Sequence, residues 1–195
     1  SFYRNPEFLA ALDYARRQGG KVHLMGLLSD GGVHSTLNHL YALLQLCRDQ
    51  QVEQVFVHGF LDGRDVPPQS ALDYINELET KMHALGVGQI ATLGGRFYGM
   101  DRDNRWERIE KAYNAMVLGE GNRYASAAAA ITASYAAGLT DEFMEPAVLE
   151  DGSGAARARL ADGDSLIFFN FRADRARQIC RSLLDEEMPN FQRRF

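Results

Sequence analysis

Long apolar runs are missing from this sequence of 195 residues. A membrane-spanning helix needs about 20 consecutive apolar residues, and no stretch of the chain approaches that length. The first residues also lack the basic-then-apolar pattern that marks a secretory signal. We therefore expect a soluble, cytoplasmic chain that has no membrane partner.

Cysteine is scarce, because Cys47 and Cys180 are the only two in the chain. Neither belongs to a CxxC pair, and both fall within apolar patterns of helical spacing. Buried free thiols are the favoured interpretation. A disulfide or a redox role is the alternative that the sequence leaves open.

Several motifs that carry chemistry are absent. No GxGxxG follows a strand pattern, and neither GxxxxGK[ST] nor GxSxG occurs, so no dinucleotide site, P-loop or hydrolase nucleophile is indicated. His34 and His39 are five residues apart, whereas two zinc ligands on one helix face are four apart. We predict no metal site within this chain.

Lysine is rare, with only Lys21, Lys81 and Lys111 among the 21 basic residues, so that the other 18 are arginines. The net charge of −5 argues against a nucleic-acid-binding surface, which needs a basic face. Arginine carries a planar, permanently charged fork that can bind carboxylate or phosphate with two hydrogen bonds. The positions of the arginines are therefore informative.

Short apolar runs alternate with longer helical patterns along the chain. The predicted strands are 22–28, 52–60, 87–93, 145–149 and 165–171. The predicted helices are 6–18, 35–48, 70–85, one that ends near 117, 125–137 and one that begins near Ala173. Asn104 and Glu107 resemble a capping box at the start of the helix that ends near 117. This order predicts a three-layer α/β/α fold with a mainly parallel sheet, in a single domain over residues 1–195.

Basic side chains follow each strong strand pattern at the point where it ends. These loops carry His34 after the first strand, Arg64 and Asp65 after the second, Arg96 and Arg102 after the third, and Arg172 and Arg175 after the last. The carboxyl ends of parallel strands lie at one edge of a sheet, where ligands bind in open α/β folds. Arginines that converge there repel one another unless an anion lies between them. The pattern therefore predicts a site for a small anionic, phosphorylated metabolite.

Two of these arginines also have an ordinary explanation. Arg64 with Asp65, and Arg102 with Asp103, are equally compatible with ion pairs that stabilise turns.

The remaining basic residues differ in how strongly they indicate a ligand. Arg172 and Arg175 are three apart in the predicted first turn of the last helix, and hence on one face. Cations at a helix N-terminus oppose the helix dipole, which favours a bound anion there. Arg105 and Arg108 are interpreted as a solvated helix face, and His58 as a core histidine.

Four stretches together resemble the insert domain of the cofactor-independent phosphoglycerate mutases. They are residues 24–40 (LMGLLSDGGVHSTLNHL), 55–71 (VFVHGFLDGRDVPPQSA), 91–113 (ATLGGRFYGMDRDNRWERIEKAY) and 162–178 (DGDSLIFFNFRADRARQ). They occur in the order and spacing of that family, and weaker similarity extends over nearly the whole chain.

The resemblance implies an isomerase of glycolysis and gluconeogenesis that interconverts 3-phosphoglycerate and 2-phosphoglycerate through a phosphoserine intermediate. In this family the serine and two divalent metal ions, manganese or similar, belong to a phosphatase-like domain, which is then the partner of this chain in the same polypeptide. The insert domain holds the glycerate. The chain itself is expected to be an inactive fragment without a cofactor or metal of its own.

The resemblance also implies roles for single residues. It makes Asp65 the proton carrier for the glycerate hydroxyls and His34 a phosphate partner, both catalytic. It makes the arginines clamps for carboxylate and phosphate, at Arg64, Arg96, Arg102, Arg172 and Arg175. Thr36, Gly95 and Gly99 depart from the family pattern, and none of them is a matched ligand position.

Two other functions stay open at this point. The chain could be a free-standing anion-binding module without catalytic activity, or a sugar-phosphate or nucleotide enzyme with a convergent set of arginines. The spacing of all four stretches favours the mutase, and the missing nucleotide motifs disfavour the third option.

Overall fold

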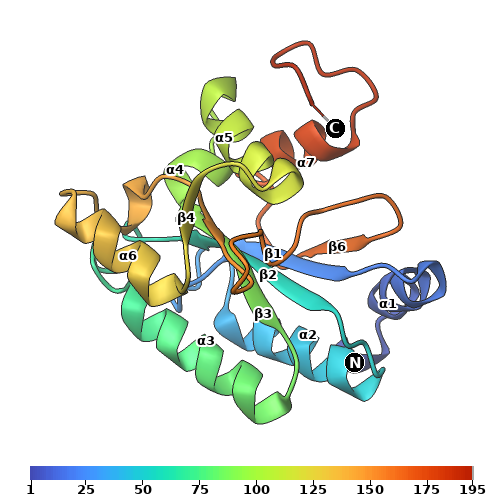
Figure 1. Ribbon diagram of the computed structural model, residues 1–195. Helices are drawn as coiled ribbons and strands as arrows, with labels where there is room; N and C mark the ends of the chain where they lie inside the picture. Colours follow the sequence, from blue (N-terminus) through green and yellow to red (C-terminus); the bar gives the residue numbers. More distant parts are fainter. Residues whose placement is uncertain (195) are drawn as a thin grey trace.

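The computed structural model describes residues 1–194 and contains one six-stranded sheet with helices packed on both faces (Figure 1). The strands are β1 (Val22–Leu27), β2 (Val55–Leu61), β3 (Gln89–Gly95), β4 (Asn122–Tyr124), β5 (Ala147–Leu149) and β6 (Ser165–Phe168). They are ordered β4-β5-β3-β2-β1-β6, and only the β3–β5 pairing is antiparallel. The predicted three-layer α/β/α fold is confirmed.

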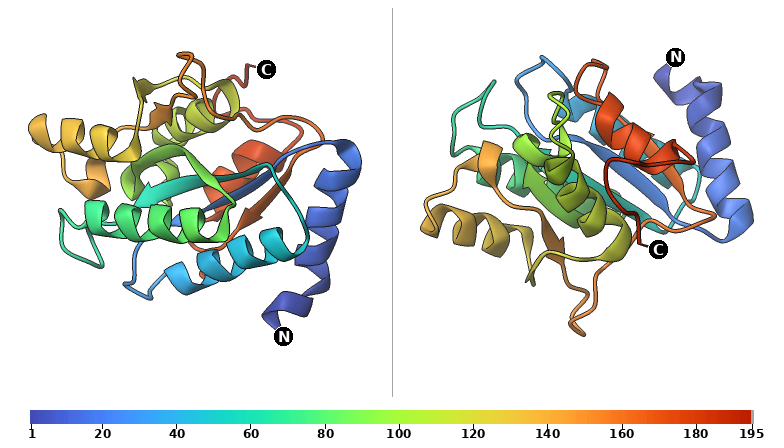
Figure 2. Two further views of the ribbon diagram at one scale, coloured as in Figure 1. Left: turned by 60° about the horizontal axis from the view of Figure 1, so that its bottom comes forward. Right: turned by 90° about the horizontal axis from the view of Figure 1, so that it is seen from above.

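The helices form the two outer layers, which the views of Figure 2 separate. They are α1 (Pro6–Gln18), α2 (Leu37–Asp49), α3 (Ala71–Leu85), α4 (Arg96–Gly99), α5 (Trp106–Leu118), α6 (Ala127–Ala136) and α7 (Arg177–Leu184), with short 3-10 turns η1 (Phe2–Arg4) and η2 (Asp141–Phe143). Within the described residues, no helix is both long and apolar enough to span a membrane.

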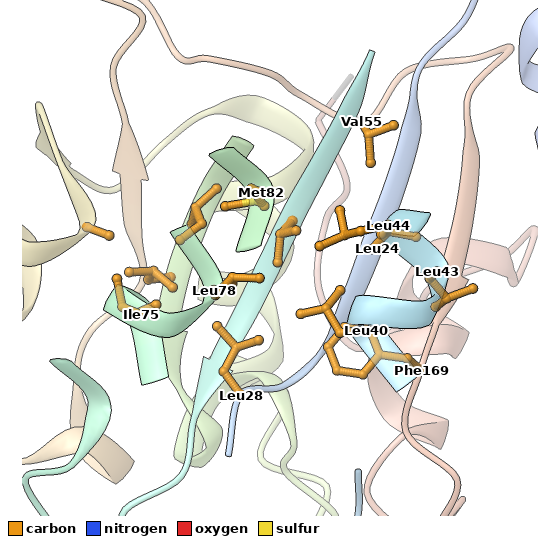
Figure 3. Close-up of a cluster of buried hydrophobic side chains, with 14 of the residues drawn as sticks. Leu24, Leu28, Leu40, Leu43, Leu44, Val55, Ile75, Leu78, Met82 and Phe169 are labelled. Carbon is orange, nitrogen blue, oxygen red and sulfur yellow. The ribbon is translucent and has the colours of Figure 1, made fainter. Parts of the chain in front are cut away.

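Two apolar clusters, one on each face of the sheet, hold these layers together. Alternate residues of a strand point to opposite faces, so Leu24 joins the cluster under α2 and α3, whereas Met25 joins the cluster under α5 and α7. Figure 3 shows the first cluster, in which Leu40 and Leu44 of α2 and Ile75 of α3 point toward β1 and β2. Each fully buried leucine of this kind contributes about 1.5–3 kcal/mol.

The cysteines lie on helices, as their spacing predicts. Cys47 on α2 is buried, Cys180 on α7 is half-buried, and both are free thiols. Burial raises the pKa of Cys47 to about 12. Cys47 is therefore a thiol at neutral pH and part of the core rather than a nucleophile.

The start of the last helix differs from the prediction. The helix α7 begins at Arg177 rather than near Ala173, because the chain after β6 bends into a loop in which the amide of Phe171 donates to the His34 carbonyl (2.8 Å). Arg172 and Arg175 therefore do not share a first helical turn, and the helix-dipole argument for an anion between them is wrong.

The start of α5 also differs. Asn104 has a left-handed φ of 58°, and its amide donates to Gln178 Oε1 (2.9 Å), so the predicted capping box with Glu107 does not form. The side chain of Asp101 accepts from the amides of Asp103 (3.2 Å) and Arg105 (2.9 Å) instead. The short strand β4 has no counterpart in the prediction.

A chain of buried hydrogen bonds crosses the middle of the sheet. Asp164 Oδ2 contacts His23 Nε2 (2.7 Å), His23 Nδ1 contacts His58 Nε2 (2.8 Å), and His58 Nδ1 contacts Thr92 Oγ1 (2.8 Å). If the carboxylate accepts from His23, then His23 accepts from His58 and His58 accepts from the Thr92 hydroxyl, so both rings are neutral and all their nitrogens are paired. His58 is thus the satisfied core histidine that the sequence predicts.

This histidine pair predicts a pH-dependent stability. Burial lowers the pKa of His23 and of His58 below the ordinary value of 6.5, so below that pH the unfolded chain binds protons that the folded chain does not. The free energy of unfolding, measured by urea denaturation, is expected to fall as the pH drops from 7.5 to 5.5. His58→Leu should flatten this dependence, whereas replacement of the exposed His83 by asparagine should leave it unchanged. An equal slope in His58→Leu would contradict the assignment.

Candidate functional site

The candidate site lies where the direction of chain connection changes in the sheet. From β1 the chain proceeds to β2 and then β3 on one side, whereas β6 pairs with β1 on the other side. Loops that leave adjacent strands toward opposite faces open a crevice at the carboxyl ends of those strands. The loops after β1, β2, β3 and β6 meet at this edge, which is called the carboxyl edge below.

Arg96 is the centre of the contacts at the carboxyl edge. Its side chain is only 2% exposed. Its Nη1 donates to Asp62 Oδ1 (2.9 Å) and to Asp65 Oδ2 (2.7 Å), and its Nη2 lies 3.2 Å from His34 Nε2. One buried guanidinium therefore joins the loops after β1, β2 and β3, and it holds two of the predicted catalytic side chains in place.

The contact with Arg96 also determines the protonation of His34. Because a guanidinium only donates, Nε2 of His34 accepts, and the ring proton of the neutral form is on Nδ1. Burial, and secondarily the charge of Arg96, lower the pKa of His34 from its ordinary value. His34 is therefore a neutral donor at Nδ1, an atom that is buried and has no hydrogen-bond partner in the structure.

Asp62 shapes the loop that carries Arg64 and Asp65. Its Oδ1 accepts from the amides of Arg64 (3.1 Å) and Asp65 (2.9 Å), and its Oδ2 accepts from the hydroxyl of Ser29 (2.6 Å). Burial alone raises the pKa of Asp62, but these hydrogen bonds and the charge of Arg96 outweigh it and hold the pKa below its usual range. The sequence analysis did not single out Asp62, although an aspartate that directly follows a strand is a typical turn-forming residue.

Glycines allow two backbone segments to approach each other beside this loop. Gly63 has a left-handed φ of 63°, and a Cβ built at Gly95 would lie only 2.0 Å from the carbonyl oxygen of Glu142 in η2. The close approach brings the side chain of Glu142 to the carboxyl edge, where Arg64 Nη1 lies 3.4 Å from its Oε1.

Asp174 connects the two exposed arginines. Its Oδ2 accepts from Arg102 Nη1 (2.7 Å), its Oδ1 lies 3.1 Å from Arg172 Nε, and the same Oδ1 is 3.8 Å from His34 Nδ1. Burial alone raises the pKa of Asp174, but Arg102 and then Arg172 outweigh it and hold the pKa below its usual range. Asp174 lies within the stretch 162–178, but no sequence signal gives it a role of its own.

A cavity of about 330 Å³ opens beside these contacts. Its walls are basic and acidic side chains with two phenylalanines: Arg64, Arg96, Phe97, Asp101, Arg102, Asp103, Arg108, Glu142, Phe143 and Arg175. Four of the five predicted arginines therefore line one cavity. The fifth, Arg172, does not line it but pairs with Asp174, which also pairs with the lining residue Arg102.

Arg175 shows how crowded the positive charges are. Its Nη1 donates to the carbonyl of Met100 (3.3 Å), and its buried Nε has no hydrogen-bond partner. Burial, followed by the charges of Arg96, Arg102 and Arg64, lowers the pKa of Arg175. An anion that binds among neighbouring positive charges stabilises them.

Unpaired polar atoms gather at the same place. Five buried side-chain N or O atoms of the described residues have no hydrogen-bond partner, and four of them belong to the site: His34 Nδ1, Arg96 Nε, Asp174 Oδ1 and Arg175 Nε. Buried polar groups are otherwise almost always paired, because leaving one unpaired is costly. Three of these four atoms are nitrogens, which suits a site for an anionic ligand.

The structure does not support the ordinary explanations given above for Arg64, Arg102 and Arg108. The structure pairs Arg64 with Glu142 and Arg102 with Asp174, rather than with their sequence neighbours. Arg108 is not a solvated residue as expected, because it lies 3.3 Å from Asp101 and 3.7 Å from the centre of the Phe97 ring, in the cavity wall.

Comparison with known proteins gives the family of this chain. A family model described as "BPG-independent PGAM N-terminus (iPGM_N)" matches residues 1–195. The chain belongs to this family. A 2,3-bisphosphoglycerate-independent phosphoglycerate mutase of Clostridium perfringens is 53% identical over 194 residues, which cover 100% of this chain and 38% of that protein. A protein of the same name from Moorella thermoacetica is 53% identical over 194 residues, covering 99% of this chain and 37% of its own length.

A solved structure of a phosphoglycerate mutase has the same fold. The phosphoglycerate mutase of Leishmania mexicana, crystallised at low cobalt concentration, superimposes with a TM-score of 0.92 at 32% identity. The match covers 97% of this chain and 36% of that one. The chain thus spans less than two fifths of the length of the relatives it matches.

The metal ions implied by the family do not fit this chain. Over residues 1–194, no three or more His, Cys, Asp or Glu side chains are grouped so that they could hold a metal ion. Asp62 and Asp65, the acidic pair at the centre of the site, are already paired with Arg96.

Proposed function

We propose that this chain is the substrate-binding insert domain of a cofactor-independent phosphoglycerate mutase. The full enzyme interconverts 3-phosphoglycerate and 2-phosphoglycerate, a step of glycolysis and gluconeogenesis in the cytoplasm. The observation that carries the proposal is the set of unpaired buried donors of His34, Arg96 and Arg175 beside a cavity lined with arginines. A ligand with both a phosphate and a carboxylate supplies acceptors to all of them.

The rest of the polypeptide has the complementary role in this proposal. A phosphatase-like domain with the nucleophilic serine and two divalent metal ions, manganese or a similar metal, supplies the group that accepts and returns the phosphoryl group. The insert domain positions the glycerate so that either hydroxyl can face the phosphoserine. Positioning and charge stabilisation are the main contributions a protein makes to phosphoryl transfer.

Within the chain, the roles follow from the contacts. Asp65 is held by Arg96 with one carboxylate oxygen, so its other oxygen can accept a proton from a glycerate hydroxyl. Neutral His34 donates from Nδ1 to a phosphate oxygen. Arg64, Arg102 and Arg172 are about half exposed, so each can exchange its surface ion pair for a contact with the ligand.

Binding to the chain tests the proposal directly. Calorimetric titration with 3-phosphoglycerate is expected to show one site, and Arg175→Gln should weaken it by about tenfold or more, because a hydrogen bond to a charged group contributes roughly 1.5–3 kcal/mol. Arg181→Gln is the matched control, since Arg181 is half exposed and contacts Asp185 and the Trp106 ring, neither of which lines the cavity.

Two outcomes would change the assignment. Unchanged affinity in Arg175→Gln would remove this residue from the site. Equal affinity of the chain for 3-phosphoglycerate and for unrelated dicarboxylates would favour the free-standing anion-binding module instead.

A further inference from the structure

The carboxylate of Asp174 lies among three basic side chains of the carboxyl edge. Arg102 Nη1 lies 2.7 Å from its Oδ2, whereas Arg172 Nε at 3.1 Å and His34 Nδ1 at 3.8 Å both face its Oδ1. Three of the seven predicted site residues thus point at one carboxylate that belongs to the protein itself. The proposed roles of these three residues require them to point at a ligand.

We propose that Asp174 is an internal stand-in for the carboxylate of the substrate, which displaces it on binding. This inference rests on the proposed function and adds a specificity-determining residue to it. Asp174 and phosphoglycerate present the same chemical group, and a guanidinium binds both with the same geometry. A ligand that lacks a carboxylate cannot make the exchange and leaves Asp174 in place.

The contacts of Asp174 are suited to displacement. Arg102 is 41% exposed and Arg172 is 50% exposed, and ion pairs at this exposure contribute little because water screens them. The contact with His34 is incomplete, since the buried Nδ1 of His34 and the buried Oδ1 of Asp174 are 3.8 Å apart and form no hydrogen bond. A substrate oxygen that approaches His34 more closely therefore gains a hydrogen bond that Asp174 does not make.

The backbone around Asp174 permits the movement as well. Residues 169–176 form a loop between β6 and α7, so Asp174 can turn away without unwinding a helix. The opposite wall of the site does not share this freedom, because Arg96 is buried and paired on both of its Nη atoms. The exchange is thus confined to the side of the site that carries Arg102 and Arg172.

Two ligands that differ only in the carboxylate test the inference. The affinities of 3-phosphoglycerate and of glycerol 3-phosphate are measured by calorimetry on the wild-type chain and on Asp174→Asn. Removal of the internal carboxylate is expected to tighten the binding of 3-phosphoglycerate by about threefold to tenfold. The binding of glycerol 3-phosphate should change by less than about twofold. Asp185→Asn, which removes an equal charge from another surface ion pair, should change neither.

Every other result counts against Asp174 as a stand-in. Equal tightening of both ligands would mean a general charge effect, and weaker binding of 3-phosphoglycerate would mean that Asp174 positions the arginines. No change in either ligand would also overturn the inference. If neither the wild-type chain nor Asp174→Asn binds 3-phosphoglycerate, the proposed function fails as well. If the wild-type chain binds 3-phosphoglycerate but Asp174→Asn does not bind it selectively more tightly, only the role of Asp174 is refuted. Thermal unfolding of both variants verifies that they are folded.

Discussion

Replacement of Arg96 by leucine is expected to lower the free energy of unfolding by about 3–5 kcal/mol, the range observed when one partner of a buried ion pair is removed. The cause is the pair of carboxylates that Arg96 Nη1 bridges. Asp62 Oδ1 lies 2.9 Å away and is almost completely buried, so without the guanidinium it stays in a poorly solvated place with its charge uncompensated. Urea denaturation of the chain at pH 7 measures the loss, and binding of 3-phosphoglycerate should be abolished.

A surface arginine provides the control for this change. Arg181 lies 2.9 Å from Asp185, but its side chain is 53% exposed, so Arg181→Leu should cost no more than about 1 kcal/mol. Arg96→Lys separates charge from geometry, because an ammonium can approach one carboxylate but cannot also reach His34 as the fork does. We expect Arg96→Lys to recover part of the stability and little of the binding. A loss in Arg96→Leu as small as in the control would refute the central role of Arg96.

The parts of the fold that the sequence predicts well are those that depend on local signals. Asn5 accepts from the amide of Glu7 (2.9 Å), Pro6 opens α1, and Gly19 ends it with a φ of 64°, so the helix has the predicted bounds 6–18. The strands of the parallel sheet are continuous apolar runs, because both of their faces are covered. Once the strands are known, the rule that ligands bind at carboxyl ends identifies the site-bearing loops.

The contacts that the sequence could not predict are long-range. The start of α7 depends on a hydrogen bond from Phe171 to His34, which are far apart in the chain. The partner of Arg102 is Asp174, 72 residues away, and not the adjacent Asp103. An arginine next to an aspartate in sequence looks like an ion pair, but the direction of each side chain is decided by the tertiary packing of the loops.

The site has a rigid half and an exposed half. Arg96, Asp62 and His34 are buried and mutually paired, so they form a frame whose geometry is set before any ligand arrives. Arg102 and Arg172 are half exposed and held only by surface ion pairs. Pre-organised groups cost no ordering energy on binding, whereas exposed ones can adapt to the shape of a ligand.

Asp65→Asn is expected to lower kcat by about 10²- to 10⁴-fold in a full-length mutase that contains this chain, the usual contribution of a positioned proton carrier. Asparagine has the same shape and can still accept from Arg96 through its carbonyl oxygen, but it cannot take a proton from a glycerate hydroxyl. The substrate position is therefore retained, and KM should change by less than about threefold. Steady-state assays with 3-phosphoglycerate and with 2-phosphoglycerate give both parameters.

Two comparisons decide whether the loss in Asp65→Asn is chemical or structural. Asp103→Asn removes the same charge from another wall of the cavity, so full activity in this variant would exclude a simple electrostatic effect. Asp62→Asn weakens the support of Arg96 and of the loop after β2, and it is expected to lower stability together with activity. Asp65→Asn should lower activity alone, because Asp65 makes only one of the two carboxylate contacts of Arg96 Nη1. Undiminished kcat in Asp65→Asn would assign the proton transfer to another group.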